Sequence, residues 1–231
     1  MEPLFDKYSD SYDEAVKKSI GFMGKSHDYY TQAKVDHLLD VLRRQYGNAE
    51  NLNVLDVGCG VGKTDSFLNG KVKALMGVDV SPCSVDQARS LNPWVQYAAY
   101  DGKSLPFGNN SFDAAFLICV MHHVPPSEHR SLLCEVSRVL KPGGALFIFE
   151  HNPYNLLTQV AVARCEFDRD AILLTRKKSY TLLKSVGLTV FESSYILFSP
   201  FDIKGRKWME KKIKKFPLGA QYCVAAIKKN D

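Results

Sequence analysis

Residues 54–62 read VLDVGCGVG, an apolar run that leads directly into a turn with three glycines. Short, nearly continuous apolar runs are typical of strands buried on both faces of a parallel sheet. Glycine adopts positive φ without strain and lets a ligand approach the backbone closely, so this turn is a candidate ligand site. We expect a helix to begin near Lys63 and Thr64, where free backbone N–H groups would favour a negatively charged ligand group.

Apolar runs and helical patterns alternate along the rest of the chain. The predicted strands are 54–57, 74–80, 95–99, 114–120, 145–149, 189–197 and 222–227. The predicted helices between them include 31–46, 84–91 and 127–140. This alternation predicts a doubly wound α/β sheet within a single domain, 1–231.

Two segments, 1–30 and 151–176, do not belong to the alternation. Ligands of doubly wound sheets bind at the carboxyl ends of the strands, where added segments can cover them. We therefore predict an N-terminal cap from residues 1–30 and an acceptor-side insertion from residues 151–176. Plain packing helices on the flank of the sheet are the alternative.

Composition describes an ordinary globular protein, with 231 residues, 45% hydrophobic residues and a formal net charge of +5. The N-terminus has no apolar segment of the signal-peptide kind. Six cysteines are scattered without a CxxC pair, which indicates reduced thiols and a cytoplasmic location. For the same reason we expect no metal site.

The charge is concentrated in residues 204–215, which hold seven basic residues and one acid. Such a cluster could contact nucleic-acid phosphates, anionic lipid head groups or an acidic substrate. A solvated, lysine-rich helix face is the favoured interpretation.

The glycine turn does not fit two common nucleotide-binding motifs. A dinucleotide fingerprint counted from Gly58 needs a small residue at position 63, where this chain has Lys63. A P-loop needs four residues between its first glycine and its Gly-Lys pair, whereas Gly58 and Gly62 are separated by three. The turn is therefore predicted to bind a small ligand without a pyrophosphate.

Acidic residues follow the next two predicted strands. Asp79 could accept hydrogen bonds from both hydroxyls of a ribose, although it could instead cap the helix that begins near Ser81. Asp101 could accept from an adenine amine, or serve only the turn in which it lies. Three ligand-facing features at three successive strand ends favour a shared nucleoside site.

At this point the sequence resembles the class I S-adenosylmethionine-dependent methyltransferases, especially their small-molecule branch. The resemblance extends over about residues 50–150, the cofactor-binding core of the family. Its segments are VLDVGCGVG (54–62), GVDVS (77–81), YDGKSLPFGNNSFDAAF (100–116), MHHV (121–124) and LKPGG (140–144).

The resemblance implies a Rossmann-like sheet of seven strands, mostly parallel, with residues 222–227 as an antiparallel last strand. It also implies S-adenosyl-L-methionine as the cofactor. The methionine end would be contacted by Asp56, Gly58, Gly60 and the backbone of Cys119. The ribose and adenine would be contacted by Asp79, Val80, Asp101 and Gly102.

Polar side chains after the fourth and fifth strands are candidates for the acceptor side. A base is needed only if the acceptor loses a proton, and the candidates are His123, Glu150 and His151. Candidate substrate contacts are Tyr12, His122, Asn152 and Tyr154. The alternatives are that the histidines cap a helix and that Asn152-Pro153 is a plain turn.

The resulting prediction is methyl transfer to a small molecule by O- or N-methylation. An RNA or protein methyltransferase is the first alternative, mildly favoured by the basic segment 204–215. A non-catalytic, cofactor-binding regulatory subunit is the second. A nicotinamide dehydrogenase is the third, and Lys63 argues against it.

Overall fold

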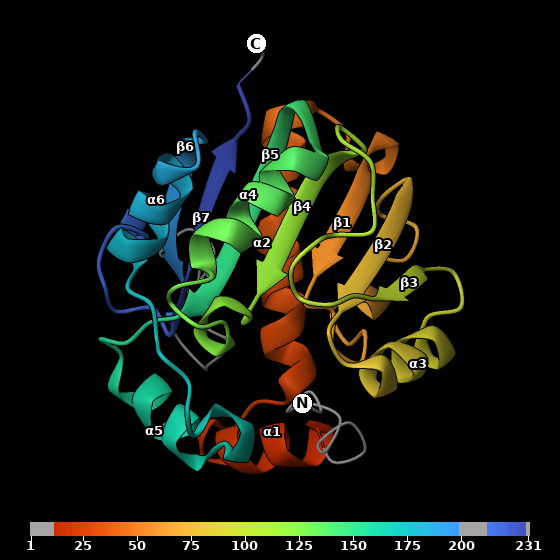
Figure 1. Ribbon diagram of the computed structural model, residues 1–231. Coiled ribbons are helices and arrows are strands. Elements are labelled where there is room, and N and C mark those ends of the chain that lie inside the picture. The colour runs from red at the N-terminus through yellow and green to blue at the C-terminus, as the bar shows by residue number, and fades with distance from the viewer. Residues whose placement is uncertain (1–11, 199–211, 230–231) are drawn as a thin grey trace.

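The computed structural model describes residues 12–198 and 212–229. Seven strands form one sheet in the order β3-β2-β1-β4-β5-β7-β6 (Figure 1). Their bounds are β1 Asn53–Val57, β2 Ala74–Asp79, β3 Gln96–Ala99, β4 Phe112–Ile118, β5 Leu140–His151, β6 Thr189–Ile196 and β7 Gln221–Ile227. All pairs from β3 to β5 are parallel, and β7 runs antiparallel to both β5 and β6. The predicted fold class, including the antiparallel last strand, is confirmed.

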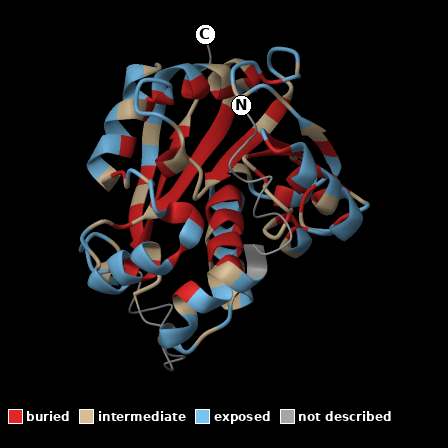
Figure 2. Ribbon diagram, turned by 60° about the horizontal axis from the view of Figure 1, so that its bottom comes forward, coloured by how far each residue is buried: buried red, intermediate tan, exposed pale blue. Residues whose placement is uncertain are grey.

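Helices cover both faces of this sheet. The α-helices of the described part of the chain are α1 Tyr12–Ile20, α2 His27–Tyr46, α3 Pro82–Leu91, α4 His129–Val139, α5 Leu156–Arg164 and α6 Arg176–Ser185. Successive residues of one strand point to opposite faces. Phe116 accordingly packs in the core that contains Leu38 of α2, and Leu117 packs in the core that contains Leu133 of α4. Most residues of the central strands are buried (Figure 2).

The prediction of an α-helix directly after the glycine turn is wrong. A three-residue 3-10 helix, Asp65–Phe67, takes its place. The Tyr97 hydroxyl donates to Asp65 Oδ2 at 2.6 Å, and the Asn92 amide donates to the Gly62 carbonyl at 2.8 Å. These buried bonds draw the segment inward, so the ligand argument based on a helix N-terminus does not apply to this turn.

Helices α1 and α5 pack against each other below the carboxyl ends of the parallel strands (Figure 1). One helix comes from the predicted N-terminal cap and the other from the predicted insertion. Lys63 of the glycine turn forms an ion pair with Asp28 at 2.9 Å, which ties the first turn of α2 to the turn. Residues 1–11 and most of the basic segment 204–215 lie outside the described residues.

None of the helices in residues 12–198 and 212–229 combines the length and the apolar character needed to cross a membrane.

Candidate functional site

A cavity of about 500 Å³ lies at the carboxyl edge of the sheet. Its walls come from the glycine turn, the ends of β2, β4 and β5, helix α2 and the α1–α5 cap. Cavities of this size suit a small ligand or cofactor. The position agrees with the rule that doubly wound sheets bind ligands beyond the carboxyl ends of their strands.

Gly58 and Gly60 of the turn differ in the space that surrounds them. Both adopt positive φ, +81° at Gly58 and +52° at Gly60. A Cβ at Gly58 would lie 2.5 Å from the side chain of Val120, so packing alone requires glycine there. A Cβ at Gly60 would meet nothing within 4 Å, and Gly60 lines the cavity. Gly60 therefore keeps a space that a ligand can fill.

Asp56 lines the cavity as a buried carboxyl, and its Oδ1 has no hydrogen-bond partner among the described residues. Burial and the neighbouring Asp65 hold the pKa of Asp56 well above its usual range. Burial also raises the pKa of Asp65 to about 6, against the opposing effect of the Tyr97 hydroxyl. A cationic group in the cavity would satisfy the unpaired oxygen of Asp56.

Lys34 is a site residue that sequence reasoning missed. It lies on α2, is buried, and lines the cavity. Within the described part of the chain its ammonium forms no hydrogen bond or ion pair. Buried lysines are normally paired, so Lys34 offers an unsatisfied cation to an anionic ligand group. A lysine within a helical pattern carries no sequence signal that distinguishes it from a surface lysine.

Asp79 ties β2 to the glycine turn. Its Oδ2 accepts from the Gly60 N–H at 2.8 Å, and its Oδ1 accepts from the Ser81 N–H at 2.9 Å. The cap of α3 is Ser81, whose hydroxyl accepts from the Ser84 N–H. Asp79 lines the cavity together with Val80, so the alternative role as the cap of α3 belongs to Ser81.

Asp101 differs from the other predicted cofactor contacts. Its exposed carboxylate accepts from the backbone N–H groups of Lys103 and Ser104 at 2.8 and 2.9 Å. These bonds hold the pKa of Asp101 below its usual range. Gly102 lines the cavity, whereas Asp101 does not. The adenine contact predicted for Asp101 thus finds no support in this geometry and stays a prediction.

Glu150 is a fully buried carboxylate behind the acceptor side of the cavity. It accepts from the Met121 N–H at 2.7 Å and contacts the His122 Nδ1 at 2.5 Å. Burial alone would raise the pKa of Glu150, but the charge of His122 lowers it. Glu150 does not line the cavity, so the structure places it against His122 rather than against a ligand.

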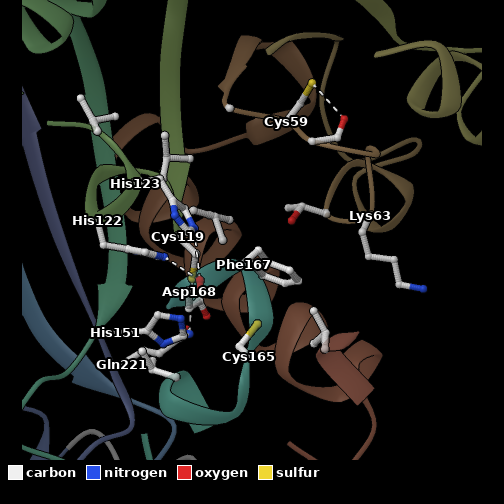
Figure 3. Close-up of a pocket in the computed structure, with 18 of the residues that line it drawn as sticks. Cys59, Lys63, Cys119, His122, His123, His151, Cys165, Phe167, Asp168 and Gln221 are labelled. Carbon is white, nitrogen blue, oxygen red and sulfur yellow. Dashed lines mark hydrogen bonds and ion pairs between the residues drawn. The ribbon is translucent and has the colours of Figure 1, made fainter. Parts of the chain in front are cut away.

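Three side chains converge at the end of β4. Asp168 Oδ1 lies 3.5 Å from His122 Nε2 and 3.2 Å from His123 Nε2 (Figure 3). Burial disfavours the charged form of His122, but Glu150 and Asp168 outweigh it and hold the pKa of His122 well above its usual range. Burial lowers the pKa of His123. Asp168, in a segment without periodicity, gave no sequence signal.

His151 faces the cavity beside Cys119 and Gln221 (Figure 3). The Gln221 amide lies 3.3 Å from His151 Nδ1 and 3.5 Å from the Cys119 sulfur. Burial opposes the charged form of His151, but its hydrogen-bonded partner Cys119 raises the pKa of His151 above its usual value. Cys119 adopts a left-handed φ of +59°, which is uncommon for a residue other than glycine.

The remaining predicted substrate contacts lie elsewhere. The Asn152 amide is buried and donates to the carbonyls of Pro217 and Gly219. Tyr154 is 63% exposed. Neither residue lines the cavity. The Tyr12 side chain lies outside the described part of the chain.

The strand order, the glycine turn after β1 and the acidic residue at the end of β2 are the features that the resemblance to the class I S-adenosylmethionine-dependent methyltransferases implies. Residues 55–148 match the family model described as a methyltransferase domain. The methyltransferase resemblance predicted from the sequence is thus confirmed over this segment.

Relatives named as methyltransferases are similar to this chain in sequence. The chain is 32% identical over 156 residues to an O-methyltransferase of Penicillium expansum. The aligned region covers 63% of this chain and 55% of the relative. It is 35% identical over 152 residues to a demethylmenaquinone methyltransferase of Tropheryma whipplei. That alignment covers 65% of this chain and 58% of the relative. The chain thus spans little more than half the length of these relatives.

Solved structures share this fold. The methyltransferase crystallised with the Trm112 methyltransferase activator of Haloferax volcanii superposes with a TM-score of 0.71 at 19% identity, covering 100% of both chains. A methyltransferase of Thermotoga maritima gives a TM-score of 0.69 at 18% identity, covering 97% of this chain and 98% of that one.

Proposed function

We propose that this protein transfers a methyl group from S-adenosyl-L-methionine to a small molecule bound between the sheet and the α1–α5 cap. The observation that carries the proposal is one cavity with two chemically different walls. The glycine turn and the end of β2 form the first wall. The imidazoles after β4 and β5, together with the cap, form the second.

The residues of the first wall fit the cofactor. The unpaired Oδ1 of Asp56 suits its ammonium, and Lys34, which lines the same cavity, offers an ammonium to its carboxylate. The open space at Gly60 admits the ligand close to the backbone, and Asp79 offers a carboxylate to the ribose hydroxyls. The cofactor supplies an already activated methyl group, so the protein has mainly to position the acceptor and exclude water.

The second wall would hold the acceptor. It combines apolar surface from Ala161, Val162 and Phe167 with the imidazoles of His123 and His151. A covered, partly apolar wall of this kind fits a small molecule rather than a polymer chain. If the acceptor carries a proton that must leave, His123 and His151 are the cavity-lining groups that could accept it.

A cytoplasmic location, with a freely diffusing acceptor, is part of this proposal. It rests on the six free cysteines, two of which are exposed. Reduced thiols are usual in that compartment.

The test combines binding with turnover. Calorimetry should show that S-adenosylhomocysteine binds, and that Asp79→Ala weakens binding by about 1.5–3 kcal/mol through loss of a charge-assisted bond. A panel of hydroxyl, carboxyl and amine compounds with methyl-labelled cofactor should then identify the acceptor. Binding without labelled product from any small molecule, but with labelled RNA or protein, would favour the first alternative. Binding without any transfer would favour a regulatory subunit.

A further inference from the structure

We propose that His122, His123 and Asp168 form a binding site for one divalent transition-metal ion. Their ligand atoms, the two Nε2 atoms and the Asp168 carboxylate oxygen, all lie within 4.8 Å of one another. Metal binding at this site can be measured without the cofactor or an acceptor.

The distances suit a common ion. Metal–ligand bonds of about 2.1 Å place neighbouring ligand atoms about 3.0–3.5 Å apart in tetrahedral or octahedral sites. Asp168 Oδ1 lies 3.2 Å from His123 Nε2 and 3.5 Å from His122 Nε2. Both imidazoles therefore already face the oxygen at separations that a bound ion requires.

The carboxylate oxygen at the centre is otherwise unsatisfied. Asp168 Oδ1 is buried and meets no donor with hydrogen-bond geometry in the described part of the chain. A buried acceptor without a well-aligned donor is destabilising. A cation placed between the oxygen and the two imidazoles would remove that destabilisation.

Groups around the cluster hold its ligands in the orientation that a metal needs. Metal-binding histidines commonly donate their second ring N–H to a carboxylate, which fixes the tautomer and the ring. The fully buried Glu150 contacts His122 Nδ1 at 2.5 Å and leaves Nε2 directed at Asp168. Asp168 is also held through its backbone, whose N–H donates to the Cys165 carbonyl at 3.2 Å. The cluster is thus held from behind, and its open side is the cavity (Figure 3).

The charges around the cluster also favour a bound cation. Glu150 and Asp168 bring two carboxylate charges into a buried region. A divalent ion with neutral imidazoles offsets both. Two imidazoles and one carboxylate favour zinc and related first-row metals over magnesium, which prefers oxygen ligands.

An occupied site would narrow the class of acceptor. Its open coordination position faces the cavity, so an acceptor with a hydroxyl or carboxylate oxygen would complete the coordination. His123 would then serve as a ligand, and His151 would remain as the imidazole free to accept a proton. This narrowing rests on the proposed function, whereas the metal site does not.

Cobalt(II), a spectroscopic substitute for zinc, provides the test. We expect the full chain, stripped with a chelator, to bind one equivalent of Co²⁺ with the visible absorption of a four- or five-coordinate site. Asp168→Asn and His123→Gln should each weaken binding at least tenfold. Asp170→Asn, at an exposed carboxylate that lines the same cavity, should bind as the parent does.

The folded state of each variant is checked by its thermal unfolding. His123 is partly exposed, so His123→Gln keeps the test decisive if Asp168→Asn fails to fold. The proposal is overturned if the parent protein does not bind Co²⁺ at micromolar concentration. It is also overturned if His123→Gln, when folded, binds with the parent's affinity. Metal binding without methyl transfer would overturn only the proposed function.

Discussion

The backbone N–H of Gly60 donates to the Asp79 carboxylate at 2.8 Å, so the glycine turn after β1 is fastened to the end of β2. This bond fixes the left-handed backbone of Gly60 at the edge of the cavity. The conformation of the turn is therefore set by the protein before any ligand binds.

Gly60→Ala should weaken binding of S-adenosylhomocysteine at least tenfold, because the new methyl group occupies cavity space. Gly70→Ala is the matched control, since Gly70 also has positive φ and open space around its Cβ but does not line the cavity. Both changes should cost about 1–2 kcal/mol of stability through backbone strain. Calorimetry and thermal unfolding separate the two effects. Equal losses of affinity would show that strain, rather than occupied space, governs binding.

Lys34→Met should weaken binding of S-adenosylhomocysteine by about 1.5–3 kcal/mol, the range for hydrogen bonds to charged groups. Binding of 5′-methylthioadenosine, which lacks the amino-acid part, should not change. Lys63→Met is the control, because Lys63 also lines the cavity but already forms an ion pair with Asp28. If Lys34→Met weakened both ligands alike, Lys34 would not act on the carboxylate.

His151→Ala should lower kcat by about 100-fold if the acceptor must lose a proton, with little change in cofactor affinity. Glu150→Gln should also lower kcat, because the Glu150 carboxylate that holds His122 in place would be lost. If the acceptor has no proton to lose, both changes should raise KM more than they lower kcat. Tyr154→Phe serves as the control, because Tyr154 is exposed and outside the cavity. Full activity in both test variants would place the acceptor elsewhere.

Ligand binding should slow amide hydrogen exchange in α1 and α5, the two helices of the cap. Cap helices that order around a ligand belong to the less stable parts of a fold. Helix α6, which packs on β6 and β7, should exchange at the same rate with and without S-adenosylhomocysteine. Unchanged exchange in α1 and α5 would make them permanent packing elements.

Acidification should destabilise the protein through His37. Burial lowers the pKa of His37 to about 4, although Glu192 and Asp40 oppose this and Arg44 and Lys214 add to it. The unfolded chain takes up a proton near pH 6.5 while the folded chain does not, so this stability is present above pH 6.5 and is lost towards pH 4. The loss is on the order of 1–3 kcal/mol.

The measurement is the urea midpoint of the parent and of His37→Gln at pH 7, 6 and 5. As the pH falls from 7 to 5, the stability of the parent should decrease more steeply than that of the variant. Parallel curves would show that His37 does not titrate differently in the two states.

The sheet could be predicted from the sequence because each buried strand is a short apolar run, and β1, β2 and β4 were located to within two residues. The turn after β1 was predictable as a turn, but its helix was not. Asp65 looks like a first-turn helix residue, and only the distant Tyr97 makes it a buried acceptor. Lys34, Cys165 and Asp168 could not be found, since each meets the site through contacts far apart in sequence.

The cap joins two segments from opposite parts of the chain, whereas the groups proposed to hold the cofactor lie mainly at the strand ends between them. Under the proposed function, the part of the acceptor wall that the cap supplies is thus encoded apart from the cofactor groups, although His123 and His151 of that wall also lie at strand ends. Replacing α1 and α5 together with their counterparts from another methyltransferase should redirect the enzyme to a different acceptor without rebuilding the nucleoside site. Replacing either helix alone would leave a mismatched surface where α1 meets α5, so a change of specificity requires both segments to change in step.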